Sequence, residues 1–456
     1  MEELKEECGV FGIYDQNDNL DVSRLVFFAL YALQHRGQES CGIAVSTNNE
    51  ITSHKDMGLV SEVFNNQILG SLKGRIGIGH VRYSTAGASN CLNAQPIVVN
   101  YKGGMMAIAH NGNLVNAEAL RRDMSDTGSI FVADADTELV IKIVSKHLVA
   151  NQNHEIALEK TMQELSGSYA MVLLLPGKLV GVRDPNGIRP LCIGKLKKSY
   201  VLSSESCAFS TIGAEFVRDV LPGEIITIDE DGLHSYQTKT PDRSAMCIFE
   251  YVYFARPDSY IDGASVHQAR FEAGKRLAIE HPVEADLVIG VPDSALSAAL
   301  GYSQQSGIPY GHGLIRNRYI GRTFIQPTQS LRDMSVRIKF SVLQNAIEGK
   351  RIVLLDDSIV RGTTTRIIVQ MLKDAGAKEV HMRISSAPVK FPCYYGIDIA
   401  SASQLIASKL SVEQICQMIG ADSLGYLSLL GMLQTPVGIK GGLCDACFTG
   451  KYCVQE

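Results

Sequence analysis

One stretch between a predicted strand and a predicted helix constrains the fold of this chain more than any other. Residues 351–355 form a short apolar run that predicts a buried strand, and residues 365–372 repeat apolar residues at helical spacing until Gly376, a residue type that commonly ends helices. The intervening loop reads Asp356, Asp357, Ser358, Ile359, Val360, Arg361, Gly362, Thr363 and Thr364. This order predicts an open α/β sheet, which binds ligands at the carboxyl ends of its strands.

The loop combines two kinds of ligand-binding chemistry. Gly362 and the threonines place unpaired backbone N–H groups and the positive end of a helix at one spot, which suits a phosphate group. The adjacent carboxylates of Asp356 and Asp357 suit ribose hydroxyls or a hydrated Mg2+. An acidic pair beside an anion site therefore predicts a sugar phosphate with a metal ion. The alternative is an ordinary β–α turn, in which Asp and Thr merely cap a helix.

The full string resembles the loop that binds 5-phosphoribosyl-1-diphosphate (PRPP) in type I phosphoribosyltransferases. The resemblance implies that Asp356 and Asp357 engage ribose and Mg2+, and that the loop amides hold the 5′-phosphate. A second predicted strand ends in the loop 292–294, where Ser294 would join the Mg2+ site. The rival GxxxxGK[ST] motif is absent, because no Gly-Lys pair, including those at 194–195 and 450–451, is followed by Ser or Thr.

Length and charge bound the class of protein. The chain has 456 residues, so two domains are expected, and its formal net charge of −5 offers no basic field for nucleic acid. No apolar run approaches the ~20 residues of a membrane span. Residues 1–7 are acidic and lack the apolar core of a secretory signal, so the 11 cysteines are expected to stay reduced in the cytoplasm.

The N-terminal half places a cysteine and several polar clusters around predicted strands. Cys8 directly precedes glycine at the start of an apolar strand, which fits either a buried free cysteine or a nucleophile. Each later cluster contains polar residues after an apolar strand, as functional loops do, although any one alone would be an ordinary turn. The clusters are 33–39 (LQHRGQE), 79–87 (GHVRYSTAG), 93–96 (NAQP), 110–116 (HNGNLVN) and 134–138 (DADTE).

In this order the clusters resemble the class II glutamine amidotransferase domain, an N-terminal-nucleophile hydrolase, over residues 8–235. The resemblance implies that Cys8 attacks the side-chain amide of glutamine, forms a γ-glutamyl thioester and releases ammonia. It assigns the oxyanion donors to the Asn111 side chain and the Gly112 N–H. Arg82 would bind the glutamine α-carboxylate, and Asp136 would face its ammonium group.

The same resemblance implies that residues 1–7 are a propeptide. In that family the base is the free α-amine of the N-terminal cysteine, and its unperturbed pKa of about 7.7–8.0 suits a base near neutrality. The seven residues ahead of Cys8 must therefore be removed. His35, His80 and His110 are expected to support the scaffold through hydrogen bonds rather than to act as bases.

Four cysteines of the second half raise the question of a metal site. Zinc and iron–sulfur clusters both need about four thiolates, and the residues alone leave the two open. The contexts of Cys247, Cys393, Cys444 and Cys447 resemble those in the iron–sulfur subgroup of glutamine PRPP amidotransferases, which implies a structural [4Fe–4S] cluster. The remaining cysteines are given no special role: Cys41, Cys91, Cys192, Cys207, Cys416 and Cys453, the last a spare near the cluster.

Residues 316–339 form a basic segment. It is either a solvated surface or, by the same resemblance, the flexible lid that orders over PRPP and neutralises departing diphosphate. Its basic side chains are Arg316, Arg318, Arg322, Arg332, Arg337 and Lys339.

Together these features predict two domains. An α+β N-terminal-nucleophile sandwich with αββα layers spans 8–235, and an α/β type I phosphoribosyltransferase domain with a mainly parallel sheet spans 245–456. The family resemblance implies that ammonia from glutamine is transferred to C1 of PRPP, giving 5-phospho-β-D-ribosylamine, diphosphate and glutamate in purine synthesis. It also implies a closed path for ammonia, a homotetramer, and inhibition by purine nucleotides (AMP, GMP, ADP and GDP).

Two alternatives fit the sequence less well. A hexosamine-forming amidotransferase would share the first domain but lack the run 353–357. A regulatory protein that senses PRPP would keep the loop but lack Cys8, Asn111 and Asp136 as a set.

Overall fold

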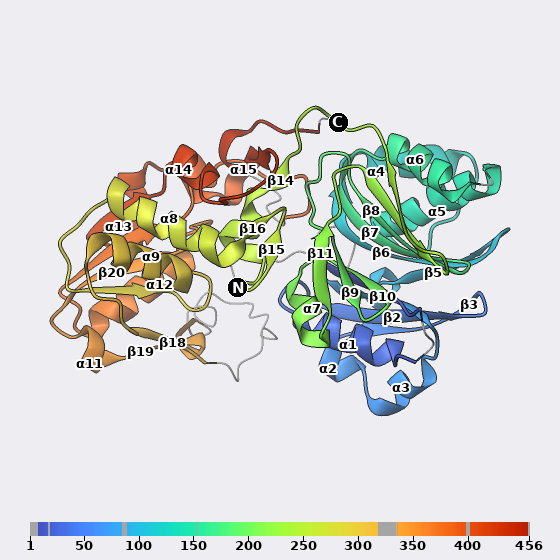
Figure 1. The fold of residues 1–456 in the computed structure, drawn as a ribbon. Coiled ribbons are helices and arrows are strands. Elements are labelled where there is room, and N and C mark those ends of the chain that lie inside the picture. Colours follow the sequence, from blue (N-terminus) through green and yellow to red (C-terminus); the bar gives the residue numbers. More distant parts are fainter. Residues whose placement is uncertain are drawn as a thin grey trace.

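The computed structural model describes residues 8–16, 19–83, 89–151, 153–317, 334, 336–397 and 402–454. Figure 1 shows two lobes side by side, the N-terminal one in blue to green and the C-terminal one in yellow to red. Within the described ranges, no helix has both the length and the apolar character needed to cross a membrane.

The N-terminal lobe consists of two antiparallel sheets stacked between helices (Figure 1). The first sheet has the order β11-β9-β10-β1-β4-β2-β3, with β1 (Gly9–Tyr14), β2 (Ser40–Thr47), β3 (Glu50–Met57), β4 (Ile76–Arg82), β9 (Cys192–Leu196), β10 (Ser199–Ser203) and β11 (Glu215–Asp219). The second has the order β13-β12-β8-β7-β6-β5, with β5 (Ile97–Tyr101), β6 (Gly104–Leu114), β7 (Gly167–Leu175), β8 (Lys178–Arg183), β12 (Glu224–Asp229) and β13 (Gly232–Gln237). The helices are α1 (Val22–Ala32), α2 (Val60–Val63), α3 (Asn66–Ser71), α4 (Ala117–Asp126), α5 (Asp136–Ala150), α6 (His154–Glu164) and α7 (Cys207–Ile212), with the 3-10 turn η1 (Cys91–Asn93).

Alternating side chains of the central strands fill the gaps between these layers. Along β1, Phe11 and Ile13 pack on the side of α1, whereas Val10 and Tyr14 pack between the two sheets. All residues of β7 are buried, because its side chains point alternately into the space between the sheets and toward α5. These cores confirm the predicted αββα sandwich.

The C-terminal lobe is built on a four-stranded parallel sheet of order β17-β20-β21-β22. Its strands are β17 (Leu287–Gly290), β20 (Arg351–Asp356), β21 (Glu379–Ile384) and β22 (Ser423–Tyr426). The helices are α8 (Val266–Glu280), α9 (Leu296–Ser306), α11 (Gln344–Ile347), α12 (Thr363–Asp374), α13 (Val412–Ile419), α14 (Leu429–Leu433) and α15 (Ala446–Thr449), with the 3-10 turns η3 (Ala402–Gln404) and η4 (Ile406–Ser408) and the π-helical turn η2 (Glu250–Phe254). Short strand pairs are β14 (Met246–Cys247) with β23 (Leu443–Cys444), β15 (Tyr260–Ile261) with β16 (Ala264–Ser265), and β18 (Leu314–Arg316) with β19 (Phe340–Val342). The predicted parallel sheet is confirmed.

The predicted strand–loop–helix unit is the centre of this lobe. β20 is paired on both sides, and its residues 352–356 are buried. Gly362 has a positive φ of 80°, which turns the chain into the first turn of α12 at Thr363. The helix ends at Asp374 with Ala375 as its C-cap, and Gly376 follows with φ of 88°, as the sequence predicts.

Two of the predicted loops are wrong, because the polar residues lie inside strands. β4 continues through His80 to Arg82, and β6 continues through Asn111 and Gly112 to Leu114. The ladder of β6 with β7 includes Asn111 opposite Ala170. The hydrogen bonds between strands are made by the backbone, so a strand can continue through residues with polar side chains. The second sheet likewise extends past residue 235, since β13 pairs with β12 up to Gln237.

Candidate active site

Cys8 immediately precedes β1 and is almost fully buried. Its Sγ donates to the Tyr83 carbonyl at 3.3 Å, and its own carbonyl accepts from Arg36 Nε at 3.0 Å. Burial raises the pKa of the Cys8 thiol to about 11, against the opposing effects of a backbone hydrogen bond with Tyr83 and of the Arg82 guanidinium. The thiol is therefore protonated at neutral pH, and a nucleophilic role requires a base that removes its proton.

Arg82 and Asp136 both act electrostatically on the Cys8 thiol. Arg82 ends β4, and Asp136 is the first residue of α5, where its carboxylate accepts from the Leu114 N–H at 3.3 Å. Burial raises the pKa of the Asp136 carboxyl, but His110, whose Nδ1 is 3.4 Å away, and the backbone donors outweigh burial and hold that pKa below its ordinary value. A buried guanidinium and an ionised carboxylate together suit the two charged groups of an α-amino acid.

Asn111 supplies a buried donor beside this site. Its Nδ2 has no hydrogen-bond partner among the described residues. At the next position Gly112 has φ of 142°, and a Cβ there would lie 2.0 Å from the Ser168 carbonyl oxygen, so only glycine fits. A buried unpaired donor is costly unless a ligand supplies an acceptor. This pair therefore matches the oxyanion donors that the family resemblance implies.

The histidines of the site have structural partners. His80 Nε2 lies 3.0 Å from the His110 carbonyl, and His110 Nδ1 lies 3.3 Å from Thr137 Oγ1. Burial lowers the pKa of His80 to about 3, so its ring is neutral and weakly basic at neutral pH. These contacts agree with scaffold roles for both residues. Residues 84–88, the end of the 79–87 cluster, lie outside the described residues.

The 356–364 loop lines a cavity of about 310 Å³ in the C-terminal lobe. Ser294 from the loop after β17 lies on the same cavity wall, as do Arg316 and Lys339. The parallel pairing of β17 with β20 brings the two loops to one edge of the sheet. The structure thus gathers the predicted PRPP-binding residues and Ser294 around one space.

The first turn of α12 lines this cavity, and its N-cap residue Gly362 provides no side-chain cap. The N-terminus of a helix attracts an anion. Beside it, the Asp357 N–H donates to Asp356 Oδ1 at 3.0 Å, and Ser358 Oγ lies 3.3 Å from Asp357 Oδ1. Carboxylate and hydroxyl oxygens are ligands that Mg2+ accepts, so Ser294, Asp356 and Asp357 fit such an ion in their chemistry.

Only part of the predicted basic lid can be placed. Arg316 lies 3.0 Å from the Asp293 carboxylate at the cavity, whereas Arg337 pairs with Asp374 of α12 at 3.4 Å. The other predicted lid arginines, Arg318, Arg322 and Arg332, lie outside the described residues.

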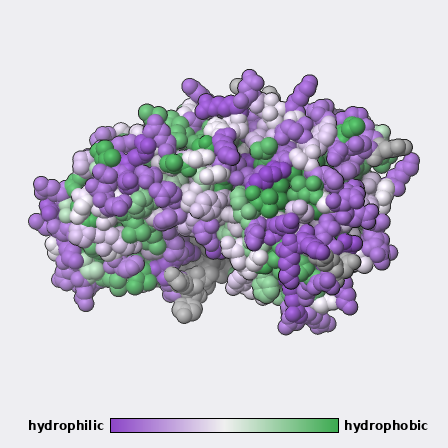
Figure 2. Space-filling view, in the orientation of Figure 1, coloured by the Kyte–Doolittle hydropathy of each residue, from purple (hydrophilic) through white to green (hydrophobic). Residues whose placement is uncertain are grey.

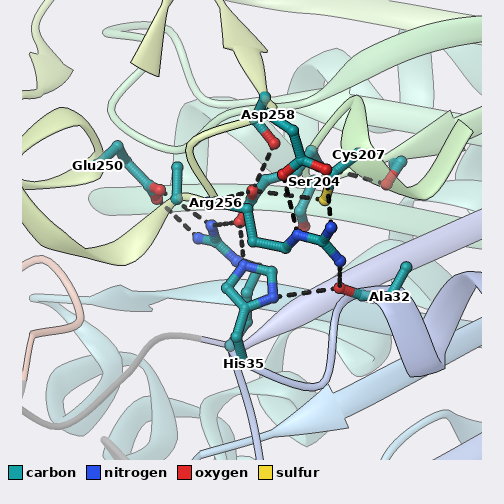
Figure 3. A network of polar contacts seen from close by, with 12 residues as sticks. Ala32, His35, Ser204, Cys207, Glu250, Arg256 and Asp258 are labelled. Atoms are coloured by element: carbon teal, nitrogen blue, oxygen red, sulfur yellow. Dashed lines mark hydrogen bonds and ion pairs between the residues drawn. The ribbon is translucent and has the colours of Figure 1, made fainter. Parts of the chain in front are cut away.

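A buried polar network joins the two lobes (Figure 3). The Arg36 guanidinium donates to Glu205 Oε1 at 2.5 Å and to both Glu250 oxygens at 2.9 and 2.7 Å. His35, which lines the acceptor cavity, lies 2.7 Å from Glu205. The Glu205 carboxylate also accepts from the Arg256 N–H at 2.9 Å. Sequence reasoning missed this network, although Glu250 interrupts an otherwise apolar run at 247–255 and so carried a signal.

The predicted cluster cysteines converge at the junction of the lobes. Cys247 lies opposite Cys444 in the β14–β23 pair, and burial, followed by the nearby Cys393 and Cys247 thiols, raises the pKa of Cys447 well above its ordinary value. The Cys447 carbonyl accepts the N–H groups of residues 390 and 391, which ties the Cys393 segment to α15. Cys453, given no special role from the sequence, is hydrogen-bonded to Cys444.

The described residues contain no group of His, Cys, Asp or Glu side chains spaced to hold one metal ion. In a [4Fe–4S] cluster the four thiolates bind different irons and surround a larger space than the ligands of one ion. The convergence of thiols from three segments is compatible with thiolate ligation of such a cluster.

Comparison with known proteins agrees with this geometry. A family model described as a glutamine amidotransferase domain matches residues 80–211. The fold and the two sites define a glutamine-dependent amidotransferase joined to a phosphoribosyltransferase.

Full-length relatives identify the family. The amidophosphoribosyltransferase of Archaeoglobus fulgidus is 53% identical to this chain, and the match covers 98% of each protein. The amidophosphoribosyltransferase of Bacillus subtilis is 48% identical, and the match covers 98% of this chain and 94% of the relative. The solved glutamine PRPP amidotransferase from B. subtilis complexed with ADP and GMP superposes with a TM-score of 0.91 at 46% identity, covering 98% of each chain. The chain belongs to the amidophosphoribosyltransferase family, enzymes that aminate PRPP with nitrogen from glutamine in purine biosynthesis.

Proposed function

We propose that Cys8 carries out the glutamine half-reaction and that the 356–364 loop binds PRPP for the second half-reaction. The observation that carries the proposal is that one short segment touches both sites. His35 lines the acceptor cavity, while its neighbour Arg36 donates to the Cys8 carbonyl. Coupled half-reactions in one chain require such closeness, because ammonia must reach the acceptor before it is lost to water.

In the first half-reaction Cys8 Sγ attacks the side-chain amide carbon of glutamine. Asn111 Nδ2 and the Gly112 N–H stabilise the negative charge that develops on the amide oxygen. The carbon–nitrogen bond then breaks, the thiol proton leaves with the nitrogen as ammonia, and water hydrolyses the thioester to glutamate. Arg82 holds the α-carboxylate and Asp136 the ammonium group of glutamine.

The base in this step is the α-amine of Cys8, which exists only after residues 1–7 are removed. These residues lie outside the described part of the chain. The high pKa of the buried thiol supports the need for such a base. Intact-mass analysis of active protein is expected to show a chain that begins at Cys8, and full activity with Met1–Glu7 retained contradicts this assignment.

In the second half-reaction ammonia attacks C1 of PRPP as the bond from C1 to diphosphate breaks. The first turn of α12 and the loop amides hold the 5′-phosphate. Arg316 and Lys339 line the cavity and neutralise the departing diphosphate. Ser294, Asp356 and Asp357 would hold Mg2+, which supplies positive charge to the diphosphate when bound.

Cys247, Cys393, Cys444 and Cys447 would hold a [4Fe–4S] cluster with a structural role. The support is the convergence of these thiols between the β14–β23 pair and α15. Cys447→Ala is expected to lower the iron content and to destabilise the lobe, because ligation of a structural metal contributes to folding. Colourless, iron-free and fully active protein contradicts the cluster, and Cys453→Ala is the control for the choice of ligands.

Regulation and assembly follow the family. Purine nucleotide inhibition of this chain by AMP, GMP, ADP or GDP is supported by the B. subtilis structure in complex with ADP and GMP. A homotetramer is supported by the apolar patch over edge strand β11 in Figure 2, where Phe216, Val217 and Leu221 are exposed. The reducing cytoplasm is the proposed location, because a thiol nucleophile and thiolate ligands both need reduced cysteines.

The test compares Cys8→Ala with wild type in PRPP-dependent diphosphate release, using either glutamine or ammonium as nitrogen donor. Loss of the glutamine reaction with retention of the ammonium reaction is expected, because only the first half-reaction needs the thiol. Glutamine-driven turnover in Cys8→Ala contradicts the nucleophile assignment.

A further inference from the structure

We propose that Glu250, a residue of the acceptor lobe, is a positioning residue for the glutamine half-reaction. Its carboxylate hydrogen-bonds Arg36 and forms an ion pair with Arg189, both buried arginines of the N-terminal lobe. Arg36 contacts Cys8, and Arg189 contacts a segment that lies beside Gly112. This inference rests on the proposed role of Cys8 as the nucleophile.

The first contact is with Arg36. Glu250 accepts from Arg36 Nη1 and Nη2 through both of its oxygens, at 2.9 and 2.7 Å. This two-pronged pairing fixes the plane of the guanidinium. The remaining Nε of Arg36 donates to the Cys8 carbonyl at 3.0 Å. The orientation of the nucleophile's own backbone therefore depends on a carboxylate from the other lobe.

The second contact is with Arg189, whose Nη1 lies 3.8 Å from Glu250 Oε1. Arg189 Nε donates to the Tyr395 carbonyl at 3.0 Å, and Ser168 Oγ donates to the same oxygen at 2.7 Å. A Cβ on the next residue, Gly396, would be in van der Waals contact with Gly112, 3.5 Å from its carbonyl carbon. Arg189 thereby holds the segment that packs against the proposed oxyanion glycine.

The contact of Glu250 with Arg36 is a pair of hydrogen bonds, whereas its contact with Arg189 is an ion pair at 3.8 Å. The side chains of Glu250, Arg36 and Arg189 are all fully buried, so solvent ions do not screen their charges. Arg36 also pairs with Glu205, a buried carboxylate of the N-terminal lobe. Docking of the acceptor lobe brings Glu250 to Arg36 as a further buried carboxylate.

A positioning role predicts a specific kinetic signature. Glu250 acts on the glutamine site through Arg36 and Arg189, so its loss is expected to change mainly the turnover number for glutamine and not the binding of either substrate. Misplacement of a reacting atom by about 1 Å lowers rates by about a hundredfold. We expect Glu250→Gln to lower kcat with glutamine by about ten- to a hundredfold, with little change in KM for glutamine.

The experiment measures PRPP-dependent diphosphate release by full-length Glu250→Gln with glutamine and with ammonium. The matched control is Glu272→Gln on α8, where the acid pairs with Lys275 away from both sites. A selective fall of kcat with glutamine, an unchanged ammonium reaction and an unaltered control support the proposal. Unchanged glutamine turnover, or an equal fall with both donors, overturns it.

A second variant covers the case in which Glu250→Gln does not fold, since loss of one buried charge leaves the arginines uncompensated. Glu250→Asp keeps the charge but shortens the reach, so the protein is expected to fold with a smaller selective loss of glutamine turnover. A folded Glu250→Asp enzyme with wild-type kcat for glutamine overturns the proposal. Cys8→Ala in the same assay separates this outcome from failure of the nucleophile assignment.

Discussion

The glutamine site and the acceptor site are built from opposite kinds of backbone. The residues around Cys8 stand on or beside paired strands of the two stacked sheets, and nearly all of them are buried. The acceptor residues stand on loops that follow β17 and β20, around an open cavity. Covalent catalysis needs atoms held within fractions of an ångström, which strands provide, whereas a large charged substrate needs donors on loops that it can reach.

The sharpest way to separate the two sites is to remove the acidic pair of the acceptor site. Asp356→Asn with Asp357→Asn is expected to lower diphosphate release by about a thousandfold or more, because the lost metal charge stabilisation is worth several kcal/mol. The loss must be equal with glutamine and with ammonium, since both donors share the acceptor. Glutamine hydrolysis measured alone is the control. A loss confined to the glutamine reaction contradicts the assignment of the two half-reactions to separate sites.

The converse change removes one oxyanion donor. Asn111→Ala is expected to lower kcat with glutamine by about 10²–10³-fold, the usual effect of losing such a donor. The ammonium reaction is expected to remain at the wild-type rate, because the acceptor loop does not contact Asn111. A fall in the ammonium reaction shows instead that the strand-built site shapes the acceptor site.

The rigidity of the strand-built site is tested by Gly112→Ala. A Cβ at this position meets the Ser168 carbonyl and is strained by the positive φ, so we expect a loss of about 3 kcal/mol in the free energy of unfolding. Chemical denaturation measures the change. Gly70→Ala on α3, where a Cβ meets nothing within 4 Å, is the matched control and is expected to be neutral or slightly stabilising.

The prediction with the smallest effect at neutral pH concerns the acid range. The pKa of His80 is about 3 in the fold and about 6.5 when unfolded, so the unfolded chain binds one more proton between these values. This contribution to stability is complete above pH 6.5 and is lost by about 1.4 kcal/mol per pH unit as the pH falls toward 3. The free energy of unfolding is measured against pH in wild type and in His80→Gln. The slope of this dependence below pH 6.5 is expected to be smaller in His80→Gln by the equivalent of one proton. Equal slopes in both proteins contradict a buried neutral ring.

Local patterns predicted much of the fold. The alternation of apolar residues in the strands, the apolar face of α12 and the glycine that ends it all describe neighbours along the chain. The acceptor loop was placed correctly between β20 and α12 for the same reason. Resemblance to known families then supplied roles for Cys8, Asn111 and Asp136 that local pattern alone leaves open.

Two kinds of feature escaped prediction. The polarity of the segments around His80 and Asn111 predicts exposed loops, whereas pairing with neighbouring strands keeps these segments in the sheets. The buried network was missed altogether, because Arg36 and Glu250 are separated by 214 positions in the chain.

By itself, the sequence determined the two domains, the order of their elements and the chemistry available at each motif, since these depend on residues close together in the chain. Only the tertiary structure decided that Glu250 of one lobe faces Arg36 and Arg189 of the other, and that thiols from three distant segments converge. Such contacts depend on how the two lobes pack against each other. A buried charge is tolerated only if an opposite charge lies beside it, and here that charge comes from a distant part of the chain.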